Sequence, residues 1–352
     1  MEITAAGLKL RLKKDLLKST LGSSFTLSLS PISKQPNAFA ALVTGGLRRK
    51  TLDGVIRGMT RLHGNCAFLA ARWEDGGAAE IIQSLHPERS MSVASEIKLY
   101  ILGAILKDIN AGRRHWDDLL ELRTDDRSYP ESQMRLWPVG MRITLETATI
   151  LMMSVSDNTA TDLLIREVGR PQIESVVLEA GNCSADRNIP FVAMREMVRL
   201  KSNHSELGRT YCGLSAETKR AFLETTVQTM PEERVTLQGS VERIEELEWF
   251  ASPNDVLRIY EYLLNHSQRG AGAQTRSILS IHPEPTWIDR SRWDFIHHKS
   301  GGEPGVLNFN YLLHSRSNGM WYLVTGTWND AQHPLRVSTF ESLLRRAIQL
   351  LP

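Results

Sequence analysis

The sequence predicts an α+β fold, in which helices flank a five-stranded antiparallel sheet and accompany an all-helical subdomain. Three observations support this prediction. Two strand-like segments near the start are joined by a turn, a long helical stretch follows, and three strand-like segments with a last helix close the chain. Strands joined by short turns pair antiparallel, and the helices can then cover the faces of the sheet.

The first elements are a helix over residues 50–63 and two strands, Cys66–Trp73 and Glu80–Gln83. The helix has its apolar residues on one face and ends before Gly64. The two strands are separated by a glycine-containing turn. From about residue 95 to residue 109 the chain is apolar almost all round, which is typical of a central, buried helix.

The remaining elements follow the same patterns. Helices are predicted at Leu145–Val155, Thr159–Val168 and Asn254–Leu264, and residues 170–290 are mostly helical with irregular loops. The closing elements are strands at Phe295–Lys299, Asn308–Ser315 and Met320–Trp328, with a two-residue turn at Asn318–Gly319 and a helix at Val337–Leu351.

We expect residues 1–45 to form a basic N-terminal extension and residues 46–352 to form one domain. Within that domain, the sheet and its helices take up about 46–90 and 285–352, and the helical part takes up about 91–284.

Composition and charge exclude several classes of protein. The formal net charge is +2, from 42 basic and 40 acidic residues, so a nucleic-acid partner is not favoured. Apolar stretches fall short of the roughly 18 residues of a membrane span, so we expect no membrane partner. Charges interrupt every apolar run within Met1–Thr20, so no secretory signal is expected, and a native start here predicts a cytoplasmic protein. The three cysteines form no CxxC pair and the histidines are scattered, so we expect no metal and no cofactor.

Three short motifs occur once each: Ser95-Glu96-Ile97-Lys98, Ser156-Asp157-Asn158 and Lys299-Ser300-Gly301. Ser95 and Lys98 are three residues apart and share one face of a helix. A buried lysine near a second cation, for which Lys299 is the candidate, can take the proton of a serine hydroxyl. Taken alone, the second motif is also explained as an N-cap for the helix that follows it.

Together, these motifs resemble those of the serine β-lactamases and penicillin-binding peptidases, most closely class A, over roughly residues 50–352. The resemblance implies an acyl-enzyme hydrolase in which Ser95 is the nucleophile, Lys98 the general base, Ser156 a proton shuttle and Lys299 an electrostatic group that binds a substrate carboxylate. It further implies that the substrate is bound by Asn158, Ser300, Gly301 and Gly302. The backbone N–H groups of Ser95 and Gly302 would form the oxyanion hole, and we expect the close approach of backbones at Gly302.

The sequence departs from class A in one respect. That class carries a Glu-x-x-Leu-Asn element whose glutamate activates the deacylating water, and no such element occurs here. Glu196 is the nearest candidate for this catalytic base, and the alternative is a surface glutamate that begins a helix over 196–201.

Three functions therefore remain open. The first is a hydrolase that opens a lactam or cleaves a related amide. The second is a cytoplasmic biosynthetic esterase, amidase or acyltransferase, and the third is a sensor that is acylated without turnover. In each case the expected partner is a small-molecule amide, lactam or ester that bears a carboxylate, and nothing in the sequence indicates the oligomeric state.

Overall fold

The computed structural model describes residues 51–129, 132–202, 205–230, 243–268, 270–281 and 285–352, and ahead of them only the strands at 2–5, 8–11 and 30–31. The chain divides into two units, residues 1–48 and 49–352. In the first unit, β1 (Glu2–Ala5), β2 (Leu8–Arg11) and β3 (Ser30–Pro31) form an antiparallel sheet. Most of the expected basic extension lies outside the described residues.

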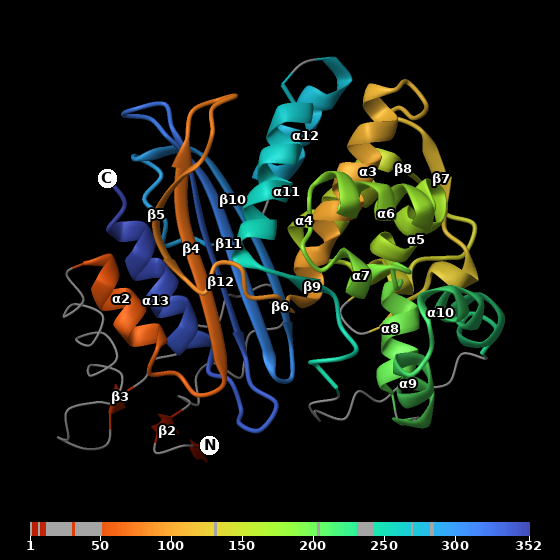
Figure 1. The fold of residues 1–352 in the computed structure, drawn as a ribbon, viewed down its shortest axis with the longest axis horizontal. Helices are drawn as coiled ribbons and strands as arrows, with labels where there is room; N and C mark the ends of the chain where they lie inside the picture. Colours follow the sequence, from red (N-terminus) through yellow and green to blue (C-terminus); the bar gives the residue numbers. More distant parts are fainter. Residues whose placement is uncertain are drawn as a thin grey trace. The chain divides into compact units, whose positions relative to one another are not determined.

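The second unit is built on a five-stranded antiparallel sheet in the order β10-β11-β12-β4-β5, as predicted (Figure 1). Its strands are β4 (Asn65–Trp73), β5 (Glu80–Leu85), β10 (Trp293–Glu303), β11 (Val306–Ser315) and β12 (Trp321–Asn329). The first two strands therefore pair with the last three, and β4 lies beside β12. The predicted two-residue turn at Asn318–Gly319 is wrong, because β11 and β12 are joined by the longer loop 316–320.

Helices cover both faces of this sheet (Figure 1). On one face, α2 (Leu52–Met59) and α13 (Val337–Gln349) pack against each other and against the sheet. On the other, α11 (Pro253–His266) and α12 (Gln274–Ser280) contact β4, β12 and β10. Side chains along β12 alternate between the two cores: Leu323 packs on the α11 side, and its neighbours Tyr322 and Val324 pack on the α13 side.

The helical part surrounds α3 (Lys98–Asn110), whose side chains are buried on almost every side, as its apolar pattern predicts. This helix contacts α4, α5, α6 and α11. The other helices of this part are α4 (Leu145–Ser154), α5 (Asn158–Val168), α6 (Arg170–Glu179), α7 (Ala185–Asn188), α8 (Met194–Lys201), α9 (Ser205–Cys212) and α10 (Ala216–Phe222). Two short strand pairs complete it, β6 (Met91–Ser92) with β9 (Phe250–Ala251) and β7 (Leu119–Glu121) with β8 (Arg142–Thr144). Among the described residues, no helix is both long enough and apolar enough to span a membrane.

Candidate active site

The three motifs lie on different elements that meet beside the edge strand of the sheet. Ser95 is on a short 3₁₀ turn, η2 (Ala94–Ile97), which leads directly into α3. Ser156 lies in the turn between α4 and α5, and Lys299 is on β10. The turn η2 contacts both β10 and β11. Each motif therefore has the structural context that the sequence predicts for it.

Lys98 is fully buried, with no exposed surface. Its Nζ donates to the backbone oxygen of Ser156 at 2.7 Å, to Ser156 Oγ at 2.9 Å and to Asn158 Oδ1 at 2.7 Å. These hydrogen bonds compensate for the cost of burying the ammonium group. They also hold Lys98 and the second motif together.

Ser156 Oγ is shared between two lysines. Lys299 Nζ donates to it at 3.0 Å, so the hydroxyl oxygen lies between the nitrogens of Lys98 and Lys299. The two nitrogens are therefore at most about 6 Å apart. Burial and a like charge nearby are the conditions under which a lysine can give up its proton and act as a base.

The backbone around the two serines is strained. Ser156 has a φ of 58° and Ala94, which precedes the proposed nucleophile, has a φ of 48°. Residues other than glycine seldom adopt this left-handed conformation, and each such residue costs roughly 1–3 kcal/mol. Two of the four such residues among those described therefore flank or form the site.

Asp157 has a structural role. Its side chain caps α5 by accepting from the N–H of Ala160 at 2.9 Å, and it also accepts from Ser132 Oγ at 2.7 Å and from the N–H of Met134 at 3.0 Å. The capping interpretation of the second motif is thus correct for Asp157. Because Asp157 makes these bonds, Ser156 and Asn158 on either side of it face the buried lysine.

Gly301 is where β10 packs directly on η2. A Cβ placed on Gly301 would lie 2.1 Å from the oxygen of Val93, 2.9 Å from the nitrogen of Ser95 and 3.1 Å from the nitrogen of Glu96. Only glycine fits, because all three neighbours are backbone atoms. The close approach expected at Gly302 is therefore found at Gly301, since a Cβ on Gly302 would meet nothing nearer than 3.6 Å.

Glu96, inside the first motif, is a buried acid that sequence reasoning did not single out. It has no exposed surface, and neither carboxylate oxygen has a hydrogen-bond partner among the described residues. Burial, with a smaller contribution from the charge of Asp255, raises the pKa of Glu96 to about 8, although the charge of Lys299 opposes the shift. The side chain is therefore mostly protonated at neutral pH. The sequence signal that could have revealed Glu96 is a glutamate at the start of an otherwise apolar helix.

Asp162 on α5 is a second buried acid that the sequence analysis missed. Its two oxygens accept the N–H groups of Met194 and Arg195, each at 2.7 Å, and so they fasten the start of α8 to α5. The pKa of Asp162 is raised to about 7, mainly by burial and in part by the charge of Glu196, while the N–H bonds and the charge of Lys98 oppose the shift.

Glu196 is held by groups outside the lysine–serine cluster. It is 2 % exposed, so the surface alternative is wrong, and α8 begins at Met194. Oε1 accepts from Arg170 at 2.8 Å and from Gln228 at 2.9 Å, and Oε2 accepts from the N–H of Ala193 at 2.8 Å and from Arg170 at 3.2 Å. These bonds occupy the roughly four acceptor positions of a carboxylate. A carboxylate so occupied is poorly placed to activate water.

A cavity of about 540 Å³ opens beside Asp162 and Glu196. Its lining consists mainly of charged side chains that already form ion pairs, such as Arg166 with Asp126. Neither Ser95 nor either lysine of the cluster lines it. We therefore do not take this cavity as the substrate site.

A buried ion pair fastens the end of β10 to the helical part. Lys201 Nζ on α8 lies 2.6 Å from Glu248 Oε1 and 2.5 Å from Glu303 Oε1. Glu303 directly follows Gly302, so this contact restrains the segment that would provide the second oxyanion donor.

Comparison with known proteins places the chain in a family. The sequence model of the Beta-lactamase enzyme family matches residues 65–308. The comparison with curated proteins gave no match.

Solved structures share the fold. A β-lactamase from Sphaerobacter thermophilus is 19% identical with a TM-score of 0.58, and the match covers 85% of this chain and 95% of that one. A variant of PBP-A, in an acyl-enzyme complex with penicillin G, is 16% identical with a TM-score of 0.56 and coverages of 85% and 94%. A β-lactamase from Francisella tularensis is 12% identical with a TM-score of 0.57 and coverages of 84% and 97%. The chain belongs to the Beta-lactamase enzyme family, and its fold is that of the serine β-lactamases and penicillin-binding proteins.

Proposed function

We propose that this protein is a serine hydrolase of the class A type, which forms an acyl-enzyme on Ser95 from a lactam or a related amide. One observation supports the proposal above all others: Ser156 Oγ lies between Lys98 Nζ at 2.9 Å and Lys299 Nζ at 3.0 Å. A hydroxyl shared by two buried lysines has partners on both sides for relaying a proton. A purely structural serine would need only one of these partners.

In the proposed acylation step, each of these residues has a defined role. Lys98, in its neutral form, takes the proton of the Ser95 hydroxyl, and Ser95 Oγ attacks the carbonyl carbon of the substrate. The backbone N–H groups of Ser95 and Gly302 stabilise the oxyanion, and each such donor contributes roughly 2.7–4 kcal/mol at the transition state. Ser156 Oγ passes the proton to the leaving nitrogen as the C–N bond breaks. The acyl group then remains on Ser95.

Substrate binding uses the rest of the motifs. Lys299 and Ser300 bind a carboxylate on the substrate by charge and by a hydroxyl hydrogen bond. Asn158 binds the amide of the substrate's side chain, and its own carbonyl is kept in place by Lys98 at 2.7 Å. Gly301 contributes by bringing β10 against the turn that carries Ser95.

The environment of Glu196 favours a second candidate, in which the same acyl-enzyme turns over slowly. Hydrolysis of an acyl-enzyme requires a base that activates water. The Glu196 carboxylate is fully engaged by Arg170, Gln228 and the backbone of Ala193. We therefore propose a structural role for Glu196. Transfer of the acyl group to another acceptor, or a sensor role, then competes with hydrolysis.

Intact-protein mass spectrometry with a fluorescent penicillin and a chromogenic cephalosporin, with absorbance followed in parallel, separates these candidates. Rapid colour with little adduct supports the hydrolase and requires a deacylating base other than Glu196. A stable adduct that peptide mapping places on Ser95 supports slow turnover. If neither colour nor adduct appears, the lactam assignment is wrong, and the search moves to metabolite esters and amides.

Two variants test the residue assignments. Ser95→Ala should abolish labelling while the melting temperature stays unchanged. Labelling that survives would refute the assignment of Ser95 as the nucleophile. Ser156→Ala should slow acylation. Its control is Ser154→Ala. The Ser154 hydroxyl donates to the backbone oxygen of Ile150 at 2.6 Å within α4, so its removal should leave the rate of acylation unchanged.

A further inference from the structure

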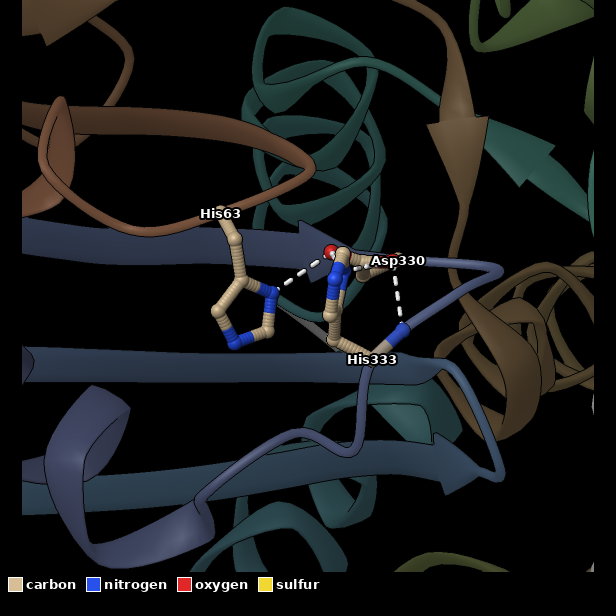
Figure 2. A group of neighbouring side chains, drawn as sticks. All are labelled: His63, Asp330 and His333. Atoms are coloured by element: carbon tan, nitrogen blue, oxygen red, sulfur yellow. Dashed lines mark hydrogen bonds and ion pairs between the residues drawn. The ribbon is translucent and has the colours of Figure 1, made fainter.

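Outside the candidate active site, His63 meets two residues from the far end of the chain, Asp330 and His333, at one end of the sheet. His63 lies between α2 and β4, Asp330 directly follows β12, and His333 lies in the loop that leads to α13 (Figure 2). Asp330 Oδ2 is 2.5 Å from His63 Nδ1 and 3.1 Å from His333 Nδ1. One nitrogen from each ring and one carboxylate oxygen lie within 4.8 Å of one another. The histidines that look scattered in the sequence thus include a pair that meets at one carboxylate.

We propose that His63, Asp330 and His333 bind a divalent transition-metal ion, with zinc as the best fit. Two imidazole nitrogens and one carboxylate oxygen suit zinc, which commonly takes three protein ligands and a water. Calcium and magnesium prefer sites made only of oxygen ligands. Figure 2 shows that both rings lie beside the same carboxylate group.

The spacing requires only a small adjustment. Ligands about 2.0–2.1 Å from a tetrahedral zinc ion are about 3.3 Å from one another. The present separations of 2.5 and 3.1 Å between nitrogen and oxygen are slightly shorter. The side chains of His63 and His333 are 42% and 59% exposed, so the rings can shift outward and an ion can enter from solvent.

Backbone hydrogen bonds fix the orientation of the Asp330 carboxylate. Asp330 is only 5% exposed at its side chain, and its Oδ1 accepts the backbone N–H groups of Gln332 at 2.6 Å and of His333 at 2.9 Å. These bonds leave Oδ2 directed at the histidines. Outer hydrogen bonds of this kind orient metal ligands, and losing them typically weakens binding 10- to 100-fold.

The segment that carries His63 is anchored as well. The Trp328 indole N–H donates to the backbone oxygen of His63 at 2.6 Å, and the rings of these two residues are 5.0 Å apart. The N–H of Asp330 donates to the oxygen of Gly305 at 2.9 Å. A bound ion would therefore join the loop after α2 to the loop before α13, and it should stabilise the fold. The site contains none of the proposed catalytic residues.

The test uses the untagged full-length chain, stripped with a chelator and titrated with Co²⁺ and Zn²⁺. We expect one equivalent of Co²⁺ to bind with the visible absorption of a tetrahedral ion, Zn²⁺ to displace it, and Zn²⁺ to raise the melting temperature. His333→Ala should weaken binding by at least about 100-fold, because it removes a direct ligand. Asp330→Asn is the second variant, since it keeps an oxygen for the N–H groups of Gln332 and His333 and so preserves the loop.

The control is His115→Ala. His115 is an exposed histidine beside a single carboxylate, with its Nδ1 3.8 Å from Asp118 Oδ1, and it should leave metal binding unchanged. If the parent chain binds no metal, or binds it equally well after His333→Ala and Asp330→Asn, the proposal is wrong. The three residues are then a hydrogen-bonded tie between two loops.

Discussion

Replacing Gly301 with alanine tests how β10 positions the turn that carries Ser95. The added Cβ would lie 2.1 Å from the backbone oxygen of Val93 and 2.9 Å from the backbone nitrogen of Ser95. Neither neighbour is a side chain that can rotate away. The strand and η2 must therefore separate by about 1 Å or more to restore an ordinary contact distance.

The size of the effect follows from that separation. Overpacking a site of this kind typically costs about 1–3 kcal/mol of stability, which a fold stable by roughly 5–15 kcal/mol survives. A displacement of about 1 Å between reacting groups can slow a reaction about 100-fold. We therefore expect Gly301→Ala to remain folded, to melt a few degrees lower, and to acylate Ser95 about 100-fold more slowly.

The assay combines thermal melting with the rate of adduct formation by intact-protein mass spectrometry. Gly302→Ala is the matched comparison, because its Cβ would meet nothing nearer than 3.6 Å and it keeps its backbone N–H. Its melting temperature should match that of the parent protein. A Gly301→Ala protein that acylates within threefold of the parent rate at an unchanged melting temperature would refute the reasoning.

Three other substitutions have defined outcomes. Lys98→Ala should slow acylation of Ser95 by about 10²- to 10⁴-fold, because it removes the general base; adduct formation at the parent rate would exclude that role. Glu96 keeps its proton in the folded chain up to about pH 8 but ionises near its ordinary value of 4.5 when unfolded. As the pH rises from about 4.5 to about 8, the free energy of unfolding of the parent protein should therefore decrease by up to about 5 kcal/mol relative to that of Glu96→Gln. Urea unfolding measures this difference. A difference that does not depend on pH would contradict a protonated, buried Glu96. Glu196→Gln leaves the Arg170 guanidinium buried without its carboxylate, so we expect a loss of about 3–5 kcal/mol with deacylation unchanged. Slower deacylation at unchanged stability would instead support Glu196 as the catalytic base for deacylation.

Much of the fold could be predicted because its signals are local. The all-round apolar pattern after Ser95 predicts a central helix, and α3 is buried on nearly every side. The order of strands and helices along the chain predicts the antiparallel sheet and the flanking helices. Strand β10 is longer than predicted, because the polar and glycine residues of the third motif continue the ladder to Glu303. These residues are extended because they pair with β11, although their own strand propensity is low.

The candidate site was predictable in kind and less so in detail. Motif spacing indicated that Ser95 and Lys98 share one helix turn, and the resemblance to the serine β-lactamases implied that Ser156 and Lys299 belong with them. It did not indicate that the close backbone contact falls at Gly301, because that contact depends on how β10 meets η2 in space.

The sequence by itself determined the fold class, because the periodicity and the order of its elements are local signals. Its three short motifs also carry the family resemblance, which implied the residues proposed for acylation. Only the tertiary structure decided which partners buried charges acquire. Glu196 meets Arg170, and His63 meets Asp330 across a separation of 267 residues. A buried or half-buried charge is stabilised by whichever opposite charge or donor the packing brings to it, and that neighbour is set by the whole fold.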